Sequence, residues 1–226
     1  MSVKEKTIQI EEKKCDTGVK KPRTLFGVEL VYLGFVGIII AGIGYLAENA
    51  ARIVAFGIID SRFHILPFIS PYALVMFLVH VLLCDCDDLR VFGKHVFKRK
   101  TAKTKLYSNI VSYLLICAFV FFGELGVGNL WDAFFGVELW DYTELPLSVT
   151  QYAGLIPTLG YGTGAFLIFK FLYKPLLSFL RKKLDFKIAK IIVLTLGSLI
   201  ILDTVRMMCM IIFFGEAPMY WSIKLW

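Results

Sequence analysis

The sequence lacks the short motifs that mark many soluble enzymes and metal-binding domains. It contains no Walker A phosphate-binding loop, no G-x-S-x-G or H-E-x-x-H pattern and no EF-hand calcium loop. Its five cysteines form no C-x-x-C pair, and none has a histidine at zinc-finger spacing. The missing Walker A loop argues against a P-loop ATPase. We therefore predict no catalytic residue, metal site or other cofactor from motifs.

Charged residues are also scarce, at 19% of 226 residues, whereas hydrophobic residues reach 58% and the mean hydropathy is +0.70. Soluble domains average about 45–50% apolar and about 25% charged residues. The apolar residues lie in long blocks, and about 20 apolar residues in a helix cross the hydrocarbon core of a bilayer. The blocks lack the alternating polarity of barrel strands, and backbone groups in lipid must be paired internally. The sequence therefore predicts an all-α, polytopic membrane helix bundle.

Five apolar blocks predict about five transmembrane helices. They cover residues 25–47, 63–84, 106–130, 154–173 and 191–214. The chain would then divide into a basic cytoplasmic tail, residues 1–24, and a single transmembrane domain, residues 25–226. The tail has no short apolar stretch with a small-residue cleavage site, so we expect the first block to be an uncleaved anchor.

The distribution of positive charge predicts the orientation. Lysine and arginine gather in the tail and in residues 85–105 and 181–190. The alternate segments differ, because residues 49–62 contain only Arg52 and Arg62 and residues 131–153 contain neither type. Cytoplasmic loops carry the excess of Lys and Arg, so this alternation predicts a cytoplasmic N-terminus and an external C-terminus. We interpret the basic runs as contacts with lipid headgroups and not with nucleic acid.

Ionisable residues within or beside the apolar blocks are the candidates for a functional site. A charge facing lipid is costly, so such residues usually face the bundle interior or a cavity. Asp203 and Arg206, three positions apart, are expected to form an ion pair. Glu48 and Glu124 are expected near the outer ends of their helices, where they would either line an outward-facing pocket or be solvated among headgroups. The full candidate polar pocket comprises Glu48, Arg62, Glu124, Asp141, Tyr142, Asp203 and Arg206.

Two further features have structural interpretations. Gly160 and Gly164 are four residues apart in an apolar block, which predicts close packing between helices. His64 and His80 are expected to be helix residues with satisfied hydrogen bonds and not metal ligands.

Several short motifs occur in an order and spacing that resemble those of a known membrane protein family. The matches in the first half are Gly44 to Glu48, Asp60 to Phe63, and Pro67 to Tyr72. Those in the second half are Glu124, Gly128, Phe135-Gly136-Val137, Trp140-Asp141-Tyr142, Thr158, Tyr161, Gly162 and Asp203. The chain departs from the family pattern at Leu139, which replaces a tryptophan, and at Tyr152, which replaces a basic residue.

Through these residues the chain resembles the Putative ABC-transporter type IV (CmpB-like) family. The resemblance implies a permease-like subunit, embedded in membrane lipids, that works with a separate ATPase docked on the loop 85–105. A bacterial plasma membrane is the expected location, with a eukaryotic membrane as the alternative. Two other functions stay open. One is a membrane-embedded enzyme acting on a lipid or isoprenoid, with Glu48 and Glu124 as acid and base. The other is a structural or assembly protein with no small-molecule site.

Overall fold

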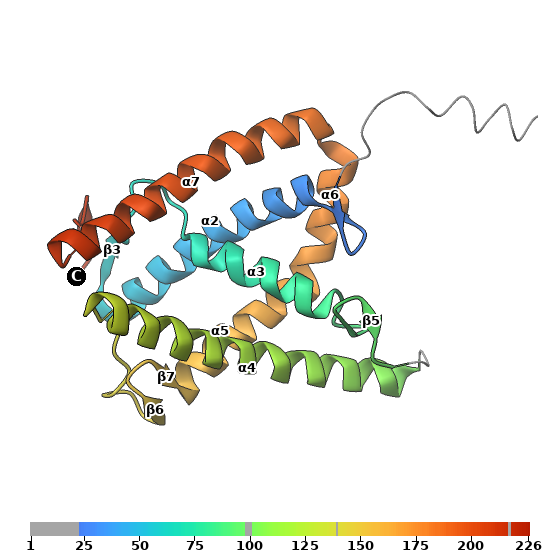
Figure 1. Cartoon of the computed structure of the whole chain (residues 1–226), viewed down its shortest axis with the longest axis horizontal. Helices are drawn as coiled ribbons and strands as arrows, with labels where there is room; N and C mark the ends of the chain where they lie inside the picture. The colour runs from blue at the N-terminus through green and yellow to red at the C-terminus, as the bar shows by residue number, and fades with distance from the viewer. Residues whose placement is uncertain (1–22, 98–100, 139, 217) are drawn as a thin grey trace, which may run out of the picture.

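The computed structural model describes residues 23–97, 101–138, 140–216 and 218–226, and it is mostly helical (Figure 1). The helices are α2 (Leu30–Phe56), α3 (Ser70–Leu83), α4 (Ala102–Phe135), α5 (Leu155–Leu167), the π-helix η1 (Ile168–Tyr173), α6 (Lys174–Lys183) and α7 (Phe186–Phe214). Short antiparallel strand pairs join them: β1 (Thr24–Leu25) with β2 (Val28–Glu29), β3 (Ile58–Asp60) with β8 (Ser222–Lys224), β4 (Arg90–Val91) with β5 (Lys94–His95), and β6 (Ser148–Thr150) with β7 (Ala153–Gly154). The predicted fold class is confirmed, while residues 1–22 of the predicted tail lie outside the described residues.

Four helical stretches are long and apolar enough to cross a membrane. They are Leu30–Val54, Ala102–Phe135, Leu155–Lys183 and Phe186–Phe214. They correspond to four of the five predicted spans, although most of their ends differ; the first, for example, runs from Leu30 to Val54, whereas residues 25–47 were predicted. The long third stretch is continuous because η1 connects α5 directly to α6.

The prediction of a helix over residues 63–84 was wrong in its first part. The helix α3 has only 14 residues and begins at Ser70. Arg62 and Phe63 have positive φ angles of 51° and 64°, which an α-helix does not contain. Pro67 also disfavours helical geometry in the residue before it. The second apolar block is therefore a non-helical segment of turns and bends, residues 63–69, followed by the short helix α3, and a fifth crossing stays a prediction.

The helices form two groups that meet chiefly at one end of the molecule (Figure 1). In the first group, α2 packs against α3 and α7. In the second group, α4 packs against α5. The main link between the groups is the continuation of α5 through η1 into α6, which packs against α2. We call them the α2–α3–α7 group and the α4–α5 group.

The apolar core lies at the end where the two groups meet. Its buried residues come from the first half of α2, the second half of α3, and η1 with α6, and they include Val36, Val79 and Tyr173. Ile116 adds the first half of α4 to the same core. The opposite half of the bundle contains most of the candidate polar residues, as described below.

The predicted packing site on α5 was displaced by two residues. A Cβ built on Gly160 or Gly164 would have no described atom within 4 Å, so the prediction of close packing there was wrong. A Cβ on Gly162 would instead lie 2.6 Å from Cys117 Sγ. Close approach of α5 to α4 therefore depends on Gly162, which the family motif had also included.

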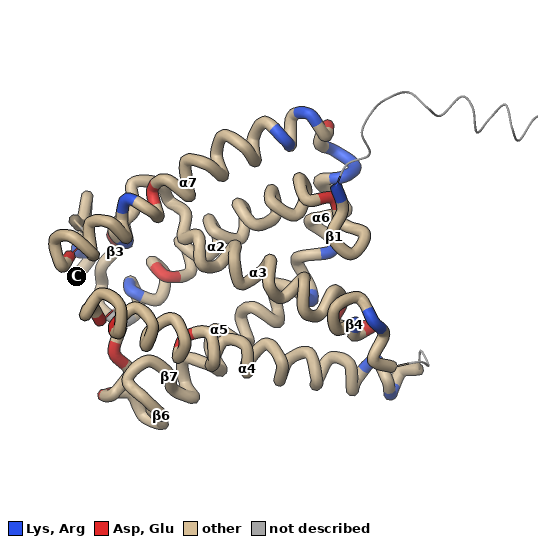
Figure 2. The backbone as a smooth tube through the Cα atoms, in the orientation of Figure 1, with Lys and Arg blue, Asp and Glu red and all other residues tan. Residues whose placement is uncertain are grey.

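The described parts of the basic segments 85–105 and 181–190 lie together at one end of the bundle (Figure 2). Three ion pairs join them to neighbouring loops and helix ends: Arg181 with Glu29, Lys174 with Asp85 at 2.6 Å, and Lys105 with Asp87 at 3.0 Å. We call this the basic end and the other the opposite end. The grouping matches the alternation in the sequence, and its assignment to the cytoplasm stays a prediction.

Candidate functional site

Glu48 is held by side chains from two other elements. The Tyr72 hydroxyl, on α3, donates a hydrogen bond to Glu48 Oε1 at 2.6 Å. Arg62, in the loop before α3, binds Glu48 Oε2 at 3.3 Å. A Cβ on Gly44, one turn before Glu48, would lie 2.4 Å from the Tyr72 ring, so glycine is needed for the ring to cross α2 at this point. The Gly44 to Glu48 motif thus positions a tyrosine on a carboxylate.

Glu124 is held less completely. The Tyr142 hydroxyl donates to Glu124 Oε1 at 3.1 Å, whereas Glu124 Oε2 is buried with no hydrogen-bond partner in the described part of the chain. The loop that carries Tyr142 is fixed by two bonds: Tyr142 N–H donates to Gln151 O at 2.8 Å, and Trp140 Nε1 donates to Tyr152 O at 3.0 Å. The second half of the family motif therefore builds a rigid loop that directs Tyr142 at Glu124.

Close packing explains the departure from the family pattern at Tyr152. A Cβ on Gly128 would lie 2.4 Å from the Tyr152 ring, so the ring packs directly on the α4 backbone. Tyr152 is 3% exposed. This position therefore serves packing in this chain, and a basic side chain is not available there to contribute to the site.

Tyr161, on α5, connects the two carboxylates. It interacts electrostatically with both Glu48 and Glu124. Tyr161 is 42% exposed, so the protein does not cover the cluster on this side. We define the carboxylate–tyrosine cluster as Glu48, Arg62, Tyr72, Glu124, Tyr142 and Tyr161. The two helix groups face each other across it, with Glu48 on one and Glu124 on the other.

Asp203 and Arg206 form a second, separate polar group. The predicted ion pair is present, with Arg206 Nη2 at 3.0 Å from Asp203 Oδ1. The Asp203 carboxylate also accepts hydrogen bonds from the backbone N–H of Ile65 at 3.0 Å and of Leu66 at 3.1 Å. Arg206 donates to Phe63 O at 2.7 Å. This pair therefore satisfies part of the backbone of the non-helical segment before α3, namely Phe63 O and the N–H groups of Ile65 and Leu66.

The two histidines have different settings. His64 is not in a helix, contrary to the prediction, and its Nδ1 lies 3.3 Å from Asp203 Oδ2. His80 is in α3 as predicted, where Nε2 lies 3.2 Å from Leu25 O and the Tyr173 hydroxyl donates to Nδ1 at 2.9 Å. Both rings thus have hydrogen-bond partners. Across the described ranges, no group of three or more His, Cys, Asp or Glu residues is arranged to hold a metal ion.

Asp60 orients the arginine of the cluster and was missed by the sequence analysis. It is fully buried, and its carboxylate pairs with Arg52 at 2.8 Å and accepts a hydrogen bond from Arg62 N–H at 2.9 Å. Asn49 Oδ1 accepts from the Asp60 N–H at 2.8 Å. The only sequence signal was the match of Asp60 to Phe63 with the family motif, because nothing local indicates that a loop aspartate is buried.

Asp141 lies apart from the cluster. It is exposed, and its carboxylate accepts hydrogen bonds at 2.8 Å from both the backbone N–H and the hydroxyl of Thr143. These two bonds hold the pKa of the Asp141 carboxyl below its ordinary value. Of the seven predicted residues, the structure therefore joins four, Glu48, Arg62, Glu124 and Tyr142, and separates the other three.

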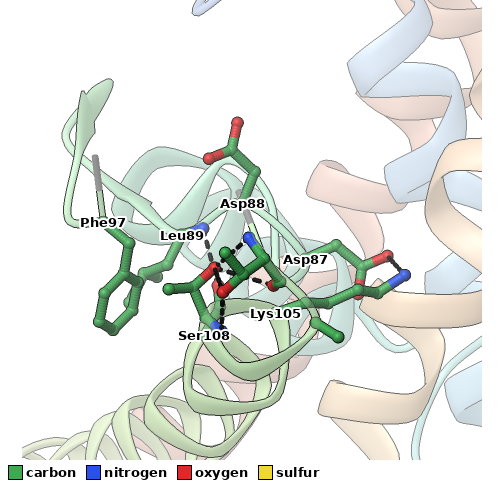
Figure 3. A pocket seen from close by; sticks show the side chains of 9 residues that line it. Asp87, Asp88, Leu89, Phe97, Lys105 and Ser108 are labelled. Carbon is green, nitrogen blue, oxygen red and sulfur yellow. Dashed lines mark hydrogen bonds and ion pairs between the residues drawn. The ribbon is translucent and has the colours of Figure 1, made fainter. Parts of the chain in front are cut away.

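A cavity of about 290 Å³ lies at the basic end, beside the start of α4 (Figure 3). Asp87, Lys105 and Ser108 are among its lining residues. The Ser108 hydroxyl donates to Cys86 O at 2.7 Å and accepts from Leu89 N–H at 2.8 Å, so the loop after α3 is fixed to α4. Burial opposes ionisation of Asp87, but bonds from Lys105 and Asn109 outweigh it and hold its pKa below the ordinary value.

The comparisons with known proteins give a family and no individual relative. The family model described as Putative ABC-transporter type IV matches residues 35–208, which is more than half of the chain. Searches of curated proteins and of solved structures found no match. The matched region contains the whole carboxylate–tyrosine cluster and Asp203. Together with its apolar helices, this match shows that the chain is an integral membrane protein of the Putative ABC-transporter type IV family.

Proposed function

We propose that the chain is the membrane-spanning, permease-like subunit of a transporter, and that the carboxylate–tyrosine cluster is its solute site. One observation carries the proposal: Glu124 Oε2 is buried without a partner among the described residues, inside a cluster built from both helix groups. A buried polar atom left unpaired costs free energy that a bound ligand recovers. Sites between two helix groups are typical of membrane transporters.

The unequal support of the two carboxylates fits a binding site. Glu48 accepts from both Tyr72 and Arg62, so its position is fixed. Glu124 accepts from Tyr142 alone among the described side chains, which leaves it available to a solute. The side chains of Glu48 and Arg62 are 20% and 23% exposed, so the cluster is not sealed.

The loop 85–105 is the proposed docking site for a separate ATPase subunit. Ser108 fixes the loop to α4, and Lys174, at the start of α6, binds Asp85 at 2.6 Å. A force applied to this loop would therefore reach α4, which carries Glu124, and also α6. Residues 98–100 of the loop lie outside the described residues.

Carbodiimides, which modify carboxyl groups, test the proposal by the route through which they reach Glu124. In sealed vesicles that expose the opposite end, a water-soluble carbodiimide is expected to label Glu124, as mapped by peptide mass spectrometry. Glu124→Gln should remove this label. Glu144→Gln, the same change at an exposed loop residue, should leave it unchanged.

Two results would contradict a solute pathway. Labelling of Glu124 only by a lipid-soluble carbodiimide would indicate access from the bilayer, as expected for an enzyme acting on a lipid. Labelling by neither reagent would indicate a closed cluster and favour a structural or assembly role. Size-exclusion profiles of the purified variants would verify that each still folds.

A further inference from the structure

The cluster contains unpaired groups of both hydrogen-bonding types. Glu124 Oε2, an acceptor, and Arg62 Nε–H, a donor, are each buried without a partner in the described ranges. A ligand that pairs both groups would carry a hydrogen-bond donor and an acceptor.

The charges of the cluster favour a cation. When both carboxyl groups are ionised, Glu48 and Glu124 carry two negative charges against the one positive charge of Arg62, so one negative charge is unbalanced. The neighbouring ion pairs of Asp60 with Arg52 and of Asp203 with Arg206 are each balanced internally. A monocation therefore completes the local charge, whereas an anion would add to the excess.

The available atoms favour an ammonium group over a metal ion. Calcium takes about six to eight oxygen ligands and magnesium requires near-octahedral coordination. Both Glu48 oxygens already accept hydrogen bonds, so one carboxylate oxygen of Glu124 is left. An ammonium group needs only a few acceptors and is also attracted to aromatic faces. Three tyrosines, Tyr72, Tyr142 and Tyr161, belong to the cluster.

We infer that the cluster binds a small ammonium compound that also carries an oxygen acceptor, as amino alcohols and amino acids do. The ammonium group donates to Glu124 Oε2, and the ligand oxygen accepts from Arg62 Nε–H. The inference rests on the proposed function for the location of the site, and it adds the chemical class of the solute. The same chemistry occurs in a free solute and in an ethanolamine lipid headgroup.

Binding of radiolabelled ethanolamine to the purified full chain in lipid nanodiscs tests the inference. We expect saturable binding near one ethanolamine for each chain in discs made only of phosphatidylglycerol. Ethylamine, which lacks the oxygen, should compete less well than unlabelled ethanolamine. Sodium and tetramethylammonium chloride, neither of which has an N–H donor, should compete still less at matched ionic strength.

Variants separate the contributions of the two charged partners. Glu124→Gln should reduce ethanolamine affinity by about a hundredfold, as for the loss of a buried charge-assisted bond worth about 3 kcal/mol. Glu144→Gln should bind like the unmodified chain. Arg62→Lys, which keeps the charge but removes the Nε–H, should abolish the preference for ethanolamine over ethylamine. A purely structural role of Arg62 would weaken both amines equally.

The possible outcomes either support or overturn the inference. Absence of saturable binding, equal competition by sodium, or unchanged affinity in Glu124→Gln would overturn it. Discs containing phosphatidylethanolamine distinguish the sources: lower ethanolamine binding in them would identify the headgroup as occupant, and unchanged binding would identify a free solute. If ethanolamine fails to bind but water-soluble carbodiimide still reaches Glu124, the ligand class fails and the transport proposal stands.

Discussion

Replacing Asp203 by alanine tests whether it holds the non-helical segment before α3, residues 63–69. Its side chain is 6% exposed, and its carboxylate accepts from the backbone N–H groups of Ile65 and Leu66 while pairing with Arg206. Alanine removes the acceptor for both N–H groups inside the protein, where few water molecules can replace it. We therefore expect loss of stability without loss of membrane insertion.

The expected magnitude follows from what the substitution leaves unpaired. Removing one partner of a buried ion pair costs about 3–5 kcal/mol. Arg206 keeps its bonds to Phe63 O and the Tyr220 hydroxyl, which favours the lower part of that range, whereas the two freed N–H groups add to the cost. About 4 kcal/mol, or roughly a thousandfold in the folding equilibrium, is the expected loss. Asp203→Asn keeps one acceptor oxygen and should lose less.

Reversible unfolding in mixed detergent micelles, followed by tryptophan fluorescence, measures this free energy. Asp141→Ala is the matched control, because Asp141 is an exposed aspartate at the same end of the bundle that bonds to Thr143. It should unfold at the same detergent composition as the unmodified chain. An average substitution lowers the free energy of unfolding by about 1 kcal/mol. If Asp203→Ala lowers it by no more than that, Asp203 does not hold the non-helical segment.

Two other predictions concern packing and pH. Gly162→Ala should destabilise the chain by about 1–3 kcal/mol, because the new methyl group clashes with Cys117. Gly160→Ala is the control and should not destabilise it, because no described atom lies within 4 Å of the new methyl group. Equal free energies of unfolding for the two variants would disprove the contact. The pKa of Asp87 in the folded chain lies below its ordinary value of 3.8, so its contribution is complete above pH 3.8 and is lost as the pH falls toward the folded pKa. The difference in melting temperature between the unmodified chain and Asp87→Asn should shrink in that window, and a constant difference would contradict the assignment.

Local physical chemistry accounts for what the sequence analysis predicted correctly. Hydropathy identified four spans because a long apolar helix is stable in lipid whatever its neighbours are. The Asp203–Arg206 pair was predictable because residues three apart on a helix are neighbours. The basic end was predictable because loop charges alternate with each crossing. None of these inferences needed a partner from a distant part of the chain.

The non-helical segment before α3, residues 63–69, was wrongly predicted to be helical because its composition is as apolar as that of a membrane-spanning helix. Pro67 and Pro71 were the available warning, since proline restricts the residue before it. Composition does not reveal that Asp203, far along the chain, supplies acceptors to the backbone of Ile65 and Leu66. A non-helical segment buried in the protein is stable only when its backbone N–H groups find such an acceptor, so tertiary contact decided its conformation.

The sequence by itself determined the membrane location, the positions of the long helices and the separation of a basic end from the rest. Only the tertiary structure decided which charges meet: Glu48 binds Arg62 while Arg52 binds Asp60, and Tyr72 and Tyr161 join the cluster. Transfer of a side chain into lipid is a property of that residue and its near neighbours. The partner of a buried carboxylate is set by how separate helices and loops pack, because each buried charge needs an opposite charge or donor wherever the fold brings one within reach.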